Sequence, residues 1–398
     1  MREIRQPARL TLLLPLLLLL VWSTSAAQSD ENTDREKPKT VSLLPAGGGL
    51  LLQGENFRFR LLGYAQAGFT LFDSELDRPD GVGDFWIRRA RVDFLMTLYD
   101  DYTLFLEIDG SPGGGFSLVE AWMNARVSSG LNVRIGKYIV PFSAEDLRSS
   151  RSLETIERYL AINGMFLMPA LDTQIGLMLH GNFGPKNRLG YAVGVFNGNG
   201  SAARMLSDDN EEKEYVGRLT YKTNDLQLGV SADYSTEEPQ TISLVDLGFN
   251  RWASEPVAGD RIGFAADAFV KSGDFSLRGE GLFFNFESPG RTDGVDYYGG
   301  YIQPALFIDG DANDGVQILA RLDVAALNTE QAIDSLSTGL PEGDMMLALL
   351  AGANWYPNPN VRFQLNAIAH RFNGPSILRG FSEARWSPMV QSGMQIKF

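Results

Sequence analysis

The sequence contains no cysteine and only two histidines among its 398 residues. Without cysteine the chain forms neither a disulfide nor a lipidated cysteine anchor, so burial or closed hydrogen bonding must hold the fold together. His180 and His370 are not at the spacing of metal ligands, and no nucleophile-elbow or phosphate-cradling glycine motif occurs. We therefore expect no enzyme activity, no metal and no cofactor, although a Ser-His-acid group assembled from distant residues would leave no local motif.

Long apolar runs are also scarce, and residues 10–22 form the one run that stands out. Three arginines precede this run and small residues follow it, which predicts a secretory signal peptide over residues 1–27. The run is shorter than the roughly 20 residues that a membrane-spanning helix needs. Polar and charged residues dominate 28–39, so we expect a flexible periplasmic N-terminus over residues 28–55.

Basic residues are outnumbered, with 35 Lys and Arg against 49 Asp and Glu, for a net charge of −14. This excess of negative charge opposes binding to nucleic acid. It does not predict the selectivity of a pore, because that depends on the charges that face the lumen.

From Phe57 onward the chain repeats one pattern, in which apolar residues alternate with polar or small ones until a turn signal follows. Alternating segments of about ten residues are typical of a transmembrane β-barrel. We expect about sixteen strands, at residues 57–72, 85–98, 102–110, 116–127, 131–138, 173–182, 188–197, 214–222, 226–235, 261–271, 274–286, 295–307, 316–327, 344–356, 361–372 and 382–398. The predicted fold is an all-β, closed antiparallel barrel over residues 56–398.

The predicted connections alternate between short and long, as in outer-membrane barrels. The short ones are rich in Gly, Asn, Asp and Pro and lie at 99–101, 128–130, 184–187, 223–225, 272–273 and 357–360. The longer ones lie at 73–84, 139–172, 198–213, 236–260, 328–343 and 373–381. Two connections depart from the rule: 287–294 is short for its side and 308–315 is long for its side, so one of these strand limits must be wrong.

The connection over residues 139–172 is the longest between two strands that should pair, and connections of that length are usually functional. It carries three arginines, Arg148, Arg151 and Arg158, together with four carboxylates, Glu145, Asp146, Glu154 and Glu157. Apolar residues at helix-like spacing between Leu153 and Leu160 predict a helical turn or two. We expect this third extracellular loop to fold into the barrel and narrow it; the alternative is an ordinary surface loop.

Alternation also predicts which charged side chains face the lumen. The basic candidates are Arg89, Arg91, Arg126, Arg134, Arg218, Lys222, Arg278, Arg321 and Arg362. The acidic candidates are Asp93, Glu107, Asp109, Glu120, Asp233, Asp267, Glu280 and Asp323. Three opposite-charge pairs two residues apart, Arg91/Asp93, Arg278/Glu280 and Arg321/Asp323, are expected to neutralise each other. Phosphate capture needs uncompensated Arg or Lys at one site, and the sequence shows no such cluster, so a structural charge network is an equal alternative.

An ordered series of short motifs resembles the phosphate-selective porins of the O and P type. The motifs are residues 85–92, 98–102, 107–109, 133–137, 140–142, 149–151, 156–158, 172–181, 194–198, 217–221, 354–356 and the terminal Phe398. The resemblance implies a sixteen-stranded outer-membrane barrel, a homotrimer, an inward-folded loop at 139–172 and passive uptake of small anions such as phosphate or pyrophosphate. It does not assign the family's binding residues to positions in this sequence.

The resemblance leaves two alternatives, a general porin for small polar solutes and a barrel that is an adhesin or an enzyme. The expected partners are the solutes, outer-membrane lipid and lipopolysaccharide. Phe398 ends an alternating strand, which resembles the signal read by the barrel assembly machinery.

Overall fold

A computed structural model describes residues 40–44, 48–72, 83–111, 115–165, 172–198, 212–245, 251–290, 292, 294–327, 345–373 and 385–398. The chain divides into two units, Met1–Lys39 and Thr40–Phe398, and only the second contains described residues. The predicted signal peptide therefore lies outside the described residues. Within the described part, no helix is both long enough and apolar enough to cross a membrane.

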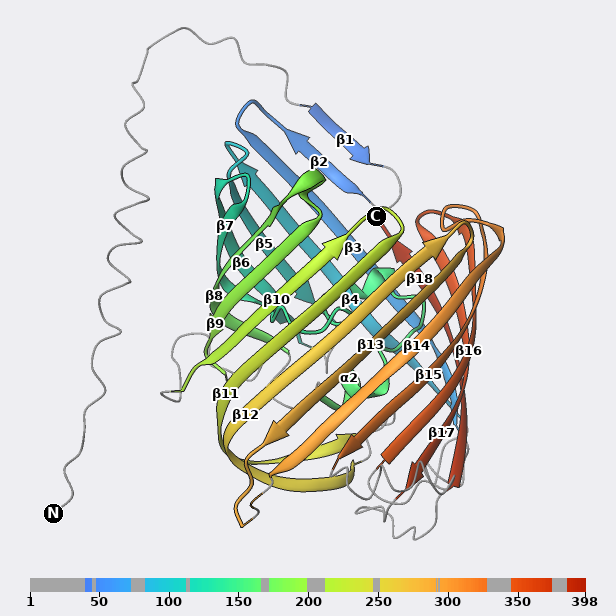
Figure 1. Ribbon diagram of the computed structural model, residues 1–398. Coiled ribbons are helices and arrows are strands. Elements are labelled where there is room, and N and C mark those ends of the chain that lie inside the picture. The colour runs from blue at the N-terminus through green and yellow to red at the C-terminus, as the bar shows by residue number, and fades with distance from the viewer. Residues whose placement is uncertain are drawn as a thin grey trace, which may run out of the picture. The chain divides into compact units, whose positions relative to one another are not determined.

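Sixteen strands of the described residues form a closed antiparallel barrel, which confirms the predicted fold. The strands are β3 (Phe57–Phe72), β4 (Gly83–Leu98), β5 (Tyr102–Asp109), β6 (Ser117–Ser128), β7 (Leu131–Ile139), β8 (Thr173–Phe183), β9 (Leu189–Phe196), β10 (Glu214–Lys222), β11 (Leu226–Val245), β12 (Arg251–Ser272), β13 (Phe275–Phe286), β14 (Val295–Gly310), β15 (Gly315–Leu327), β16 (Met345–Asn358), β17 (Val361–Asn373) and β18 (Arg385–Lys397). Each pairs with its neighbour in sequence (Figure 1). The ring closes because β18 pairs with β3, from Met389↔Phe72 to Lys397↔Tyr64.

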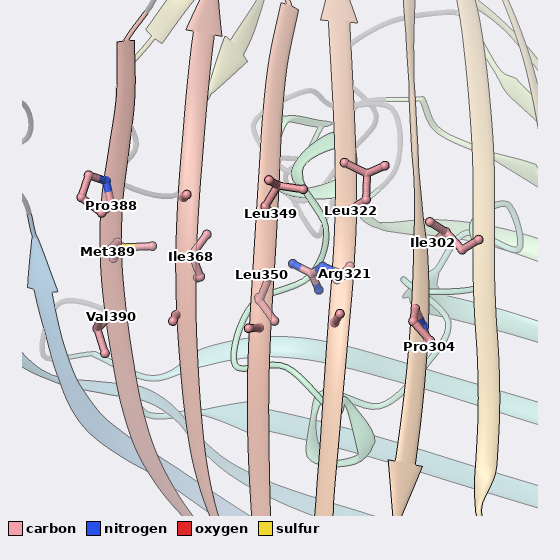
Figure 2. Close-up of a pocket in the computed structure, with 14 residues that line it drawn as sticks. Ile302, Pro304, Arg321, Leu322, Leu349, Leu350, Ile368, Pro388, Met389 and Val390 are labelled. Atoms are coloured by element: carbon pink, nitrogen blue, oxygen red, sulfur yellow. The ribbon is translucent and has the colours of Figure 1, made fainter.

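Alternation along the strands separates an apolar outer face from a polar inner face. In β18, Val390 and Met394 are exposed whereas Gln391 and Gln395 are buried. Figure 2 shows the same separation on β14–β18, where Leu322 and Leu349 lie on the outer face and the Arg321 side chain extends to the opposite side. An apolar hollow of about 650 Å³ interrupts this outer face. Apolar atoms outside and polar atoms inside match lipid around the barrel and water within it.

Most connections on one rim are longer than those on the other, as the sequence predicts. β14 extends to Gly310 and β15 begins at Gly315. The connection expected at 308–315 is therefore a short turn, and its strand limits were the wrong ones. The C-terminal strand ends on the short-turn rim, since the Lys397 backbone N–H donates to the Asn360 carbonyl.

The long loop expected at 236–260 is wrong, because β11 and β12 continue through most of it. Residues 240–245 pair with residues 251–257, beyond a register shift between Glu237 and Gln240. Pro239 falls within this irregularity, where a missing backbone N–H breaks no ladder bond. Figure 1 shows both strands curving beyond this point. Two prolines and several charged residues interrupt the alternation in this interval, so the sequence did not predict the strand that resumes at Thr241.

Part of the segment predicted to be flexible, residues 28–55, is a β-hairpin instead. β1 (Thr40–Leu44) pairs with β2 (Gly49–Gln53). β2 in turn pairs with the start of β3, from Leu50↔Leu61 to Gln53↔Arg58. β18 ends opposite Tyr64, so the hairpin covers the stretch of β3 edge that β18 leaves unpaired.

Candidate functional site

The segment between β7 and β8 is bonded to inner-face side chains from strands all around the ring. Its backbone carbonyls accept hydrogen bonds from Arg89 on β4, Arg218 on β10, Arg321 on β15, Asn354 on β16, Arg362 on β17 and Gln395 on β18. Two of its backbone N–H groups donate to Glu280 on β13 and Asn366 on β17. A segment held by all these strands at once crosses the interior of the barrel.

Apolar side chains fix the same segment against one side of the barrel. The helical turns expected between Leu153 and Leu160 do not form there, because residues 153–159 are not helical. The helices of the segment lie on either side of that stretch, η1 (Ser150–Ser152) before it and α2 (Leu160–Met165) after it. Tyr159 packs on Tyr301, with ring centroids 4.6 Å apart. The Tyr297 hydroxyl donates to the Ala161 carbonyl at 2.7 Å. These contacts lie on β14, so the segment covers that side of the inner wall.

Arg148, the first loop arginine, is neutralised within the segment. Its guanidinium lies 3.0 Å from Glu145 and 2.8 Å from Glu154. Arg278 on β13 lies 3.3 Å from the other Glu154 oxygen. Burial opposes ionisation of Glu154, but the charges of Arg148 and Arg278 outweigh it and lower the Glu154 pKa to about 2.

Arg158 is a buried structural residue. Its Nε lies 3.3 Å from Asp146, and its two Nη groups donate to the Ser150 hydroxyl and to the carbonyls of Asp146 and Arg148. Burial raises the pKa of Asp146 to about 6, although the charge of Arg158 opposes the rise. These bonds hold the turn around residues 146–150 in shape.

Arg151 differs from the other two loop arginines. Its nearest carboxylate is Asp93 on β4, at 4.0 Å, and its side chain is 31% exposed. Its Nη1 has no hydrogen-bond partner within the described part of the chain. Arg151 is therefore partly exposed, and its charge has only this one distant carboxylate among the described residues.

Four of the wall arginines predicted from the sequence form ion pairs. Arg91 lies 2.5 Å from Glu107 and 2.9 Å from Asp109, and Arg218 lies 2.5 Å from Asp267. Arg321 pairs with Asp323 at 2.8 Å, which confirms one of the three expected same-strand pairs. The other two expected pairs are wrong, because Arg91 pairs across to β5 and Arg278 pairs with the loop. Residues opposite each other on adjacent strands are closer than residues two apart on one strand.

Two wall arginines have only neutral partners among the described residues. Arg89 donates to the Gln66 side chain at 2.8 Å and to the Ile156 carbonyl. Arg362 donates to the Leu153 carbonyl at 2.6 Å and to the Gln395 side chain at 3.0 Å. Gln66 and Gln395 are hydrogen-bonded to each other at 2.7 Å. Gln395 also donates to the Arg151 carbonyl. The structure thus brings Arg89, Arg362 and Arg151 together around one turn of the loop.

The last two arginines among the predicted pore residues lie on β6 and β7. Arg134 stacks on the Trp122 ring, with its Cζ 3.9 Å from the ring centroid. Arg126 is exposed near the short turn that follows β6. Neither residue belongs to the group around the loop.

Two charged residues that the sequence analysis missed also matter inside the barrel. Arg88 makes a two-pronged pair with Glu157 of the loop, at 2.7 and 2.9 Å. A register shift opposite Gln66 and Ala67 places Arg88 on the same face as Arg89, which strict alternation excludes. Arg261 is fully buried among Asp233, Glu214 and Glu237. The sequence analysis missed it because it directly follows residues 236–260, which were expected to be a loop. In the described part of the chain, no group of three or more His, Cys, Asp or Glu could hold a metal ion.

Comparison with known proteins identifies a matching family and solved structures with a similar fold. The model of the family described as phosphate-selective porin O and P matches residues 59–374. No curated protein matches the chain in sequence.

Solved outer-membrane barrels resemble the structure at low sequence identity. OmpT of Vibrio cholerae, solved in a trimer form, has a TM-score of 0.60 at 9% identity, over 86% of this chain and 100% of its own. The anion-selective porin of Comamonas acidovorans has a TM-score of 0.60 at 14% identity, with the same two coverages. The DcaP channel of Acinetobacter baumannii has a TM-score of 0.56 at 9% identity, over 86% and 98%. At these identities the likeness establishes the fold alone.

Proposed function

This chain belongs to the phosphate-selective porin O and P family, and on that premise we propose that it takes up small anions such as phosphate or pyrophosphate by passive diffusion. Membership of the family makes it an outer-membrane porin, which agrees with its sixteen-stranded barrel and apolar outer face. The family and the fold indicate a channel rather than an enzyme.

The observation that carries the proposal is the group of Arg89, Arg151 and Arg362. Arg89 and Arg362 have no ion pair with any described carboxylate, and Arg151 has only the contact of 4.0 Å to Asp93. Three guanidinium groups around one turn of the loop create a positive potential that small anions enter favourably. Guanidinium groups suit phosphate because their N–H groups match its oxygens in pairs.

We also propose that the loop at 139–172 sets the narrowest part of the channel. Its hydrogen bonds to β4, β10, β13 and β15–β18 support this role, because a segment fixed across the lumen leaves less room for a solute. A charge at a narrow point acts on a passing ion at short range and in a reduced dielectric. Arg151 is then the residue with the greatest influence on selectivity.

A homotrimer within outer-membrane lipid and lipopolysaccharide completes the proposal. The trimer form of the similar OmpT structure supports the assembly state. Exposed apolar side chains such as Leu219, Val230 and Leu365 suit contact with lipid. We propose that the barrel assembly machinery reads the terminal strand that ends at Phe398.

A general porin for small polar solutes, with weak ion selectivity, is the second candidate. It is favoured by the pairing of Arg91, Arg218, Arg278 and Arg321 with carboxylates. Paired charges largely cancel at the distance of a permeating ion, so the field in the lumen would be weak.

Planar-bilayer recording of the purified protein tests the proposal. We expect discrete conductance steps in KCl, and we expect added phosphate to reduce the chloride current. Arg151→Ala should weaken that inhibition. Arg58→Ala should leave it unchanged, because Arg58 pairs with Asp100 on the short-turn rim, where its side chain is 47% exposed. An absence of steps would reject the channel, and steps that phosphate does not reduce would favour the general porin.

A further inference from the structure

A flat aromatic surface lies on the inner wall, formed by Phe105 on β5 and Trp122 on β6. The two residues are directly opposite in the ladder, and their rings stack with centroids 5.1 Å apart and planes 27° apart. Met123, the next residue along β6, is 59% exposed on the outer face. Trp122 therefore points inward. Both rings are half-buried, so they offer the lumen an apolar surface, here called the aromatic shelf.

The guanidinium of Arg134 lies over the Trp122 ring of this shelf. Its Cζ is 3.9 Å from the centroid of Trp122 and 5.5 Å from that of Tyr138. Within the described part of the chain, Arg134 makes no hydrogen bond or ion pair, and its Nε is buried without a partner. Contact with an aromatic face holds a guanidinium in place while its N–H donors, which lie in its own plane, stay free.

A carboxylate is fixed beside the same indole. The Trp122 Nε1–H donates to Glu120 Oε2 at 2.9 Å. Glu120 and Arg134 form no salt bridge with each other, and Glu120 forms none with any other cation of the described residues. The shelf thus carries one basic and one acidic side chain, each in contact with Trp122, and no salt bridge joins them.

We propose that Arg134, Trp122 and Glu120 form a subsite for a zwitterionic solute, an α-amino acid with an aromatic or large apolar side chain. The solute carboxylate accepts from the free edge of Arg134, and its ammonium group donates to Glu120. Its side chain covers the shelf formed with Phe105. Both polar contacts are charge-assisted hydrogen bonds, which are the stronger class. The inference rests on the proposed channel, because the solute reaches this wall only through the lumen.

The chemistry separates this site from the arginines around the loop. Those arginines have neutral partners or distant carboxylates, so they favour a solute that is purely anionic. The shelf instead pairs a cation with an anion across an apolar surface. A purely anionic ligand would gain the contact with Arg134 and be repelled by Glu120. A purely cationic ligand would gain the contact with Glu120 and be repelled by Arg134.

Three probes with the same phenyl ring test the site in single-channel recordings of the wild-type protein. L-Phenylalanine carries both charges, 3-phenylpropionate only the negative charge, and phenethylamine only the positive charge. We expect transient interruptions of the chloride current with phenylalanine at the lowest concentration. The half-blocking concentrations of the other two should be higher by about tenfold or more, because each loses one charged hydrogen bond.

Variants then assign the contacts. Glu120→Gln should raise the half-blocking concentration of phenylalanine by about tenfold. The difference between the half-blocking concentrations of phenylalanine and 3-phenylpropionate should then become smaller. Arg134→Gln should raise the half-blocking concentration of phenylalanine to the same extent as Glu120→Gln. Arg58→Gln, at the rim, should change neither. Equal block by 3-phenylpropionate and phenylalanine in the wild type, or no block by phenylalanine, would overturn the proposal. Chloride conductance would persist in either case, whereas a chain that forms no channel would show no conductance at all.

Discussion

Gly63 and Phe398 close the seam of the barrel by exchanging two backbone hydrogen bonds. The Phe398 N–H donates to the Gly63 carbonyl at 3.0 Å, and the Gly63 N–H donates to the Phe398 carbonyl at 3.3 Å. A side chain at position 63 would place its first carbon 2.7 Å from the Phe398 ring. The terminal residue therefore fits where a glycine leaves room for it.

Enlarging position 63 should disturb closure of the barrel. Gly63→Leu crowds the Phe398 ring and the Arg91 carbonyl, and overpacking of this kind costs about 1–3 kcal/mol. We expect less heat-modifiable, inserted barrel in outer-membrane fractions. Gly217→Leu is the matched control, because the added carbon would meet nothing within 4 Å. Equal insertion of the two variants would contradict the role of this contact.

Deleting Phe398 should reduce membrane insertion while export continues. The deletion removes both bonds to Gly63 and the terminal aromatic residue that we propose as an assembly signal. The measurement compares the inserted and periplasmic fractions of the truncated protein. Normal insertion would count against both roles.

The loop arginines should respond differently to substitution. Arg151→Ala should lower the anion selectivity of the channel, measured as a change in the reversal potential. A unit charge roughly 8 Å from the ion path, at an effective dielectric constant of about 40, is worth about 1 kcal/mol, or roughly fivefold in permeability ratio. Arg158→Ala should instead loosen the loop, because Arg158 holds Asp146 and three further oxygens. Bilayer recordings would show this as noisier current at nearly unchanged selectivity. Identical effects of the two variants would contradict the distinction.

Acid should release the loop from the wall at Glu154. Its pKa is lowered to about 2 from an ordinary value of 4.5, since Arg148 and Arg278 outweigh the effect of burial. A lowered pKa means that the stabilisation is complete above about pH 4.5 and is lost as the pH falls toward 2; its size is about 3 kcal/mol. Open-channel conductance should therefore rise between pH 4.5 and 2. Glu154→Gln should lack most of this rise, and an identical pH profile would disprove the assignment.

Shortening the loop should widen the channel. Deletion of residues 145–161 removes the part that bonds to β13–β18, and single-channel conductance should increase. Heat-modifiable migration in gels would show whether the shortened barrel is intact. An intact barrel with unchanged conductance would place the loop outside the conducting path.

Alternation predicted the strands well because a membrane barrel forces it: every residue faces either lipid or lumen. It failed where that constraint is relaxed. Arg88 lies at a register shift that no local sequence signal marks, and β11 continues past Pro239 because a β-bulge accommodates the proline.

The charge partners were the least predictable part of the interior. Sequence spacing suggested Asp93 for Arg91, but register places Asp109 directly opposite Arg91. The neutral partners of Arg89 and Arg362 depend on the path of the loop, which neighbouring residues in the sequence do not encode. For the same reason the group formed with Arg151 was not visible before the fold was known.

The reversal potential of the purified channel in a roughly tenfold KCl gradient tests the central claim most directly. If Arg89, Arg151 and Arg362 give the lumen a positive electrostatic potential, the reversal potential will have the sign of preferential chloride flow. Its magnitude will be smaller in Arg151→Ala. A potential of the opposite sign, for preferential potassium flow, would contradict the account of an anion channel.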